Sequence, residues 1–187
     1  MVVVEKLTDE SVLRWACART LRPGQESKAS FGKMLQCEHS PIRTQLYKIT
    51  LVGVPTFVSV HLVRHKLGVE HFVQSNRDDR GGSGNTENRM TPVVHALIAN
   101  AQSLIAMSRK RLCLNAHQQT VAWWTRVRKA IKKVDPVMAQ YLVPECVYRN
   151  GLCPELHMCK AGVDKVCSAY PAWGGKRAEL VNGKKHA

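Results

Sequence analysis

Residues 64–77 hold the side chains of this sequence whose types and spacing are best suited to chemistry. Arg64, His65 and Lys66 follow an apolar run, and a polar cluster at residues 74–77 comes a few residues later. Guanidinium, imidazolium and ammonium groups donate charge-assisted hydrogen bonds to phosphate oxygens. Amide and hydroxyl groups hydrogen-bond the polar edge of a heterocycle. The stretch can therefore hold a phosphorylated cofactor at one end and a polar heterocycle at the other.

The net charge of the chain points to anionic partners. It is +14, from 28 Lys and Arg against 14 Asp and Glu, and such an excess favours polyanions or phosphorylated small molecules. Much of the charge lies at residues 109–111 and 126–133 and in the tail at 176–185. A nucleic-acid reader interleaves such charges with aromatic side chains, and the tail does not. Nucleic acid stays open as a partner, but a mononucleotide is favoured.

Length and composition indicate one globular domain. The 187 residues are 44% hydrophobic and 22% charged, which is enough apolar material for a core. No apolar stretch approaches the ~20 residues that span a bilayer, and the N-terminus turns charged too soon for a signal peptide. We therefore expect a soluble, cytoplasmic protein with no membrane partner.

The elements that must position the residues of interest follow from periodicity, caps and breakers. The predicted strands are at residues 2–6 and 47–54, and the predicted helices at 8–19, 31–36, 56–67, 93–112, 116–134 and 136–142. Residues 78–92 read as a glycine-containing loop. On the helix at 56–67, His61, Arg64 and His65 would lie at i, i+3 and i+4 and would share a face.

Several of these pieces occur together in one known family. Glu38-His39 precedes the strand at 47–54, a helix then ends in Arg64-His65-Lys66, and Ser75-x-Arg77 follows. Residues 138–144, Met-Ala-Gln-Tyr-Leu-Val-Pro, look like an Ala-Arg-x-x-Leu-Pro segment. In order and approximate spacing, residues 30–150 resemble the flavin-dependent thymidylate synthases, of which this chain would be a divergent member.

The resemblance implies a fold and a reaction. The fold would be α+β, a central, mostly antiparallel sheet flanked by helices, in a single domain at 1–168 with a basic, loosely ordered tail at 169–187. The family transfers a one-carbon unit from methylenetetrahydrofolate to C5 of dUMP, with reduced FAD supplying hydride and NADPH as a further co-substrate. It forms homotetramers whose active sites draw residues from several subunits.

The resemblance also implies roles for individual residues. Those implied to bind the cofactor are His39, Arg64, His65, Lys66 and Asn150. Those implied to be catalytic are Ser75 and Arg77, with Ser75 polarising the base. Those implied to bind the substrate are His61, Gln74, Ser75, Arg77 and Gln140.

The sequence departs from the family mostly on the substrate side. Lys66 stands where the family has Arg, which keeps the charge but loses bidentate geometry. Val73 replaces a glutamate, Asp78 a tyrosine, and Gln140 an arginine. The acceptor could therefore be dUMP, a cytosine nucleotide or a base within a polymer, and the reaction could be a hydroxymethylation. The alternative is a nucleic-acid-binding protein on the same fold without catalytic activity.

The cysteines and two further histidines complete the candidates. Seven cysteines without an export signal indicate thiols or metal ligands rather than disulfides. Four of them could close a tetrahedral zinc site, and buried free thiols would explain them equally well. This set is Cys146, Cys153, Cys159 and Cys167. His95 and His117 have no partner in the sequence that indicates catalysis, so we interpret them as ordinary polar positions.

Overall fold

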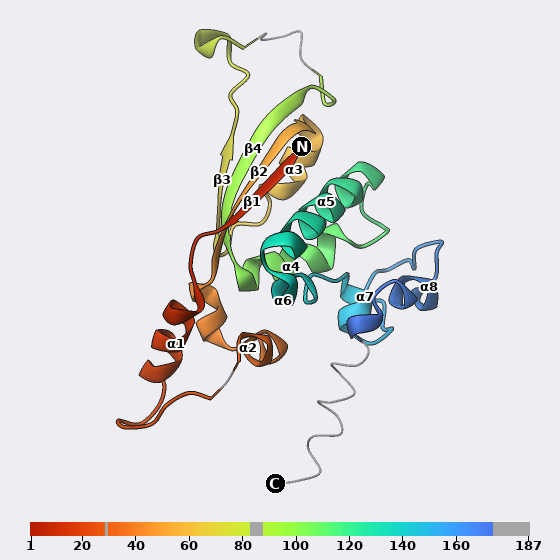
Figure 1. Ribbon diagram of the computed structural model, residues 1–187. Coiled ribbons are helices and arrows are strands. Elements are labelled where there is room, and N and C mark those ends of the chain that lie inside the picture. Colours follow the sequence, from red (N-terminus) through yellow and green to blue (C-terminus); the bar gives the residue numbers. More distant parts are fainter. Residues whose placement is uncertain (29, 83–87, 174–187) are drawn as a thin grey trace.

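One antiparallel sheet organises the chain (Figure 1). A computed structural model gives its coordinates, and the structure describes residues 1–28, 30–82 and 88–173. The sheet has four strands in the order β1-β2-β4-β3, every neighbouring pair antiparallel. The strands are β1 (Val2–Lys6), β2 (Leu46–Pro55), β3 (Val69–Val73) and β4 (Pro92–Asn100). The predicted α+β class with a mostly antiparallel sheet is therefore confirmed.

Helices pack on one side of this sheet. In Figure 1, α4 and α5 lie beside one face of the sheet, and α1 and α2 lie below its lower end. The helices before β4 are α1 (Glu10–Arg19), α2 (Phe31–Cys37), η1 (Ser40–Thr44), α3 (Thr56–Leu62) and η2 (Asp78–Arg80). Those after it are α4 (Ala101–Arg111), α5 (Gln118–Val134), α6 (Pro136–Ala139), α7 (Glu145–Tyr148) and α8 (Val163–Ser168). Within the described ranges, none of them is long and apolar enough to cross a membrane.

The predicted helix at 93–112 is wrong in its first half. Residues 93–99 form part of β4, whose side chains alternate between buried and more exposed positions. Asn100 then ends the strand and caps α4, because its side chain accepts a hydrogen bond from the Ser103 backbone N–H at 2.9 Å. Pairing with β2 on one side and β3 on the other satisfies the backbone of β4, and this outweighs its helical propensity.

A buried carboxylate fastens three elements together. Asp135, between α5 and α6, accepts hydrogen bonds from the Tyr47 hydroxyl of β2 and the Lys6 ammonium of β1, both at 2.8 Å. Its other oxygen caps α6 through the Met138 N–H at 2.8 Å. Burial, then the carboxylate beside it, raises the pKa of Tyr47, so this hydroxyl stays a donor. Asp135 thus fixes α6 against the sheet.

The packed part of the chain extends further than predicted. Trp173 is only 9% exposed, and its ring meets those of Tyr141 and Tyr148 at centroid distances of 6.0 and 5.7 Å. The first residues of the predicted loose tail, 169–173, therefore belong to the folded domain. The remainder of that predicted tail, 174–187, lies outside the described residues.

The other face of the sheet is partly apolar and exposed. Val3 and Phe72 are 50% and 59% exposed, and the cross-strand pair Val52 and Val94 is also exposed. The register places Val3 opposite Thr50, Thr50 opposite Ala96 and Ala96 opposite Phe72, so these side chains share one face. We call the exposed side chains of Val3, Val52, Phe72 and Val94 the outer sheet face.

Candidate functional site

The basic triplet lies in a turn, not on a helix. Helix α3 ends at Leu62, so Arg64 and His65 do not continue the helical face predicted to include His61. Gly68 explains the turn, because its φ of +67° is left-handed and a Cβ there would lie 2.5 Å from the Ser103 hydroxyl. That hydroxyl donates to the Leu67 carbonyl at 2.5 Å. The turn is therefore clamped to the first turn of α4.

The triplet lines a pocket of about 290 Å³. The pocket lies between the turn and α4, and its lining residues are Arg64, His65, Lys66, Leu67, Ser103, Ala106 and Met107. Arg64 and Lys66 are exposed, and neither forms an ion pair with a residue that the structure describes. Two cations without acidic partners at the edge of a pocket can bind an anion such as a diphosphate.

Helix α4 also anchors the segment that carries His39. Glu38 adopts a left-handed φ of 48° and accepts hydrogen bonds from the Gln102 amide at 2.5 Å and from the Arg109 guanidinium. Arg109 stacks on the Tyr148 ring, 3.6 Å from its centroid. His39 itself is exposed. His39, which is predicted to lie near the flavin, thus directly follows Glu38. The Glu38 carboxylate is bound to α4, and α4 forms one wall of the pocket.

A chain of one buried and two half-buried histidines connects the pocket to the interior of the sheet. The Ser59 hydroxyl lies 2.8 Å from His95 Nδ1, and His95 Nε2 lies 2.9 Å from His71 Nδ1. His71 Nε2 lies 2.8 Å from the carbonyl oxygen of His65. At the pocket, His65 Nε2 accepts a hydrogen bond from Arg111 Nε at 2.9 Å.

The positions of the hydrogens in this histidine network can be deduced from the groups at its ends. A carbonyl oxygen can only accept, so His71 Nε2 must carry the hydrogen. With His71 Nδ1 as the acceptor, His95 donates from Nε2 and accepts the Ser59 O–H at Nδ1. Burial first, then His71, lowers the pKa of His95 to about 4. Burial first, then Arg111 and His71, lowers the pKa of His65 to about 4. His65 and His95 are therefore neutral at physiological pH.

This neutrality predicts a loss of stability in mild acid. His95 titrates near pH 4 when folded and near 6.5 when unfolded, so below pH 6.5 the unfolded chain binds the extra proton. The stabilisation is complete above pH 6.5 and is lost as pH falls toward 4. We expect the free energy of unfolding in urea to fall by about 2 kcal/mol from pH 7 to pH 5 for this group. In His95→Gln, which cannot titrate, the fall should shrink by that amount; an unchanged pH dependence would contradict the assignment.

The polar cluster lies beyond the opposite end of β3. Gln74 extends the sheet, since its side-chain Oε1 accepts from the Val94 N–H at 3.0 Å while its own N–H donates to the Val94 carbonyl. The Arg77 guanidinium donates two hydrogen bonds to the Asp79 carboxylate, at 2.8 and 2.7 Å. The hydroxyl of Ser75 accepts from the Arg77 N–H at 3.4 Å. A strand rises about 3.3 Å per residue, so β3 separates this cluster from the triplet within one chain by on the order of 15 Å.

The other predicted ligand-binding residues are not at this pocket. His61 faces α5, where its Nδ1 lies 2.9 Å from the Thr120 hydroxyl, and burial, then Arg111 and Arg64, lowers its pKa. Asn150 is exposed and takes a φ of 53° just beyond α7. Gln140 lines a separate pocket with residues of α5.

The four cysteines predicted as a zinc site are not arranged as one. Throughout the described residues, no group of three or more His, Cys, Asp or Glu side chains could hold a metal ion. A small apolar cavity instead brings Cys146, Cys153 and Cys159 near Cys113, which the prediction did not include. Burial is the main cause that raises the pKa of Cys146 to about 11, and a protonated thiol is a poor metal ligand. These groups are free, half-buried thiols.

Sequence reasoning missed Ser59, His71 and His95 as members of one network. The sequence pattern predicts His95 as an ordinary polar position on a helix, whereas it is fully buried in β4. Recognising alternation at 93–99 would have placed it on the covered face of a strand. The short β-branched and aromatic run at 69–73 would then have supplied a partner strand carrying His71.

Comparisons with known proteins show what the fold resembles. No family model matches this sequence, and no curated protein matches it either. Thymidylate Synthase X (ThyX) from Helicobacter pylori, solved with FAD and dUMP, superposes with a TM-score of 0.57 at 12% identity, covering 76% of this chain and 99% of that one. The UMP/dUMP methylase PolB from Streptomyces cacaoi, bound with 5-Br dUMP, gives 0.54 at 12% identity, covering 75% and 94%. At this identity the likeness shows the fold.

Proposed function

We propose that this protein is a flavoenzyme that transfers a one-carbon unit to C5 of a pyrimidine deoxynucleotide. The single observation that carries the proposal is that Arg64, His65 and Lys66 line a pocket on a fold shared with two enzymes solved with dUMP or an analogue. The expected co-substrates are methylenetetrahydrofolate and NADPH, and the expected cofactor is FAD. The acceptor is dUMP or a related nucleotide.

The residues of the pocket suit the diphosphate of FAD. Arg64 can bind a phosphate through two N–H groups, and Lys66 adds a mobile point charge. His65 is neutral and its Nε2 is occupied by Arg111, so it offers one N–H donor at Nδ1. A pocket of about 290 Å³ takes the phosphates and leaves the rings outside it. When bound, the flavin supplies the hydride for the reaction.

The substrate side would be completed by a second copy of the chain. Within one chain Ser75 and Arg77 lie on the order of 15 Å from the triplet, so a compact site that uses both would draw on two chains. Both side chains of the Arg77–Asp79 ion pair are exposed. Exposed ion pairs contribute at most about 1 kcal/mol to stability. A substrate phosphate can therefore replace Asp79 as the partner of Arg77 at little cost in free energy. The outer sheet face offers apolar area for association. We therefore propose a homotetramer, as in the family that the sequence resembles.

Flavin uptake and turnover test this proposal together. Purified protein, incubated with FAD and desalted, is expected to keep the flavin absorption bands. With methylenetetrahydrofolate and NADPH it should then convert dUMP, or dCMP if the acceptor differs, to a product with added carbon that mass spectrometry detects. Colourless protein that takes up no FAD would refute the flavoenzyme. Steeply salt-dependent DNA binding without flavin uptake would instead favour a nucleic-acid-binding protein.

A further inference from the structure

Helix α5 is strongly basic along its second half. Its 17 residues include no Asp or Glu, and its cations are Arg126, Arg128, Lys129, Lys132 and Lys133. Arg128 is half-buried and the other four are exposed. None of them forms an ion pair with a residue that the structure describes. The positive charge of this helix is therefore uncompensated within the described part of the chain.

The four exposed cations share one side of the helix, which we call the α5 stripe: Arg126, Lys129, Lys132 and Lys133. At 3.6 residues per turn, the positions 126, 129 and 133 are neighbours on one side, and 132 lies beside them. From 126 to 133 the stripe is on the order of 10 Å long. Lys129 and Lys133 are four residues apart, and like charges at that spacing repel each other. A polyanion along the stripe would remove this repulsion.

The α5 stripe stays open if copies of the chain associate through the outer sheet face. Helix α5 packs against β1 and α6, on the side of the sheet shown in Figure 1. Lys6 of β1 points to that side, where it binds Asp135 at the end of α5. Val3, an odd number of residues away on the same strand, points to the outer sheet face. Association there would therefore not cover the stripe.

The composition of the stripe favours one kind of polyanion. Single-stranded nucleic acid stacks its bases on exposed aromatic rings, but Trp123 is only 8% exposed, with the Arg126 guanidinium 4.7 Å from its ring centroid. A membrane-surface helix inserts its apolar face, and the apolar face of α5 is packed inside the protein. Lysine is depleted in protein–protein interfaces. A row of cations alone is what the phosphate backbone of a double helix requires.

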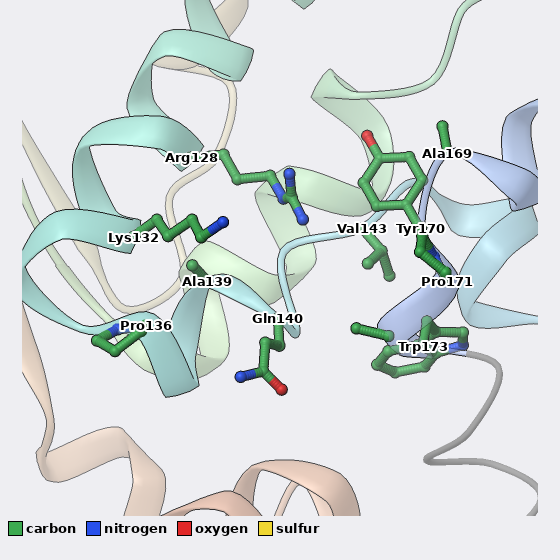
Figure 2. A pocket seen from close by; sticks show the side chains of 11 residues that line it. Arg128, Lys132, Pro136, Ala139, Gln140, Val143, Ala169, Tyr170, Pro171 and Trp173 are labelled. Atoms are coloured by element: carbon green, nitrogen blue, oxygen red, sulfur yellow. The ribbon is translucent and has the colours of Figure 1, made fainter.

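One edge of the stripe borders a pocket of about 320 Å³ (Figure 2). Figure 2 shows Arg128 and Lys132 reaching from α5 toward Tyr170 and Trp173. The Arg128 guanidinium lies 4.9 Å from the centroid of the Tyr170 ring, and this contact holds the cation in place. No acidic residue lines the pocket, so the positive potential of the stripe is not interrupted at this edge.

We propose that the α5 stripe binds the phosphate backbone of a double-stranded nucleic acid. Contacts to phosphates carry no direct sequence information, so the binding would not depend on sequence. Double-stranded DNA and double-stranded RNA share this chemistry and are the two possible sources. The inference goes beyond the proposed function, because the stripe requires neither a flavin nor a pyrimidine nucleotide at the triplet pocket.

Fluorescence anisotropy of labelled duplexes, titrated with the full chain, tests the stripe. Four phosphate contacts predict that the logarithm of the affinity falls with the logarithm of the salt concentration with a slope of about −3 to −4. Between about 50 and 200 mM salt this is a loss of about 100-fold. In Lys129→Gln/Lys133→Gln the slope should become shallower by about 2, equally for every sequence. Because the two lysines are exposed and repel each other, this variant should not be less stable in urea.

The matched control removes two cations far from the stripe. Arg22 and Lys28 are exposed in the segment between α1 and α2, which Figure 1 shows well away from α5. Arg22→Gln/Lys28→Gln should keep the slope and most of the affinity. An equal loss in this control would mean that net charge attracts the duplex, and it would overturn the assignment to α5.

The remaining outcomes identify the partner or reject it. DNA and RNA duplexes of one sequence show which source binds more tightly. Tighter binding to a single strand, or to vesicles containing phosphatidylserine, would overturn the choice of a double helix. Absence of duplex binding at about 50 mM salt would overturn the proposal as a whole. FAD uptake by Lys129→Gln/Lys133→Gln should be unchanged, because neither lysine lines the triplet pocket, so failure of either proposal leaves the other standing.

Discussion

Replacing Arg64 and Lys66 together by glutamine is expected to weaken FAD binding by about 100-fold or more. Each side chain would lose a charge-assisted hydrogen bond to a phosphate, worth about 1.5–3 kcal/mol, and about 2.7 kcal/mol in total corresponds to that factor. The loss should appear directly in a titration that follows flavin fluorescence. Since both residues are exposed and unpaired within the described chain, the free energy of unfolding should change little.

A matched double variant separates local binding from overall charge. Lys160→Gln/Lys165→Gln removes two exposed cations near α8, far along the chain from the triplet pocket. It should take up FAD like the unaltered protein. If it loses as much affinity as Arg64→Gln/Lys66→Gln, the flavin is attracted by net charge and not by this pocket. If neither variant changes the affinity, the triplet does not hold the diphosphate.

Local pattern predicted the elements that one strong feature defines. The β-branched run before Pro55 predicted β2, and the amphipathic repeat ending at Asp135 predicted α5. The local pattern gave a wrong prediction where a strand repeat and a helix repeat fit the same residues. In β4 the apolar residues satisfy both a strand and a helix repeat, and only pairing with β2 and β3 decides between them. Because that pairing is long-range, a reading of local periodicity could not detect it.

The candidate site was predictable only in part, for the same reason. Arg64, His65 and Lys66 were found because they are adjacent in sequence, and the structure places them around one pocket. The network of Ser59, His71 and His95 joins α3, β3 and β4, so its members become neighbours only through the sheet. The pocket of Figure 2 needs the packing of Trp173, in a segment that composition had suggested to be loose. Tertiary packing, rather than residue type, creates these two features.

The histidine network gives the triplet turn a rigid attachment. Gly68 and Ser103 fix one side of the turn to α4, and the hydrogen bond from His71 to the His65 carbonyl fixes the other to the sheet. A loop held at both sides presents its cations in one arrangement, which lowers the entropy lost when a ligand binds. Acid that charges the network would therefore weaken both the fold and the presentation of Arg64 and Lys66.

The largest loss of stability is expected from Asp135→Ala, about 3–5 kcal/mol. Removing the carboxylate leaves the buried Tyr47 hydroxyl and the Lys6 ammonium without their acceptor and removes the N-cap of α6. Asp135→Asn keeps one acceptor oxygen, which can serve the cap of α6 or the Tyr47 and Lys6 donors but not both, so it should cost less than alanine, about half as much. Urea unfolding at pH 7.5 measures both, and a cost below about 1 kcal/mol for alanine would show that Asp135 does not fasten these elements. FAD uptake at the triplet should be affected only through the fraction of the protein that unfolds, because Asp135 does not line the triplet pocket.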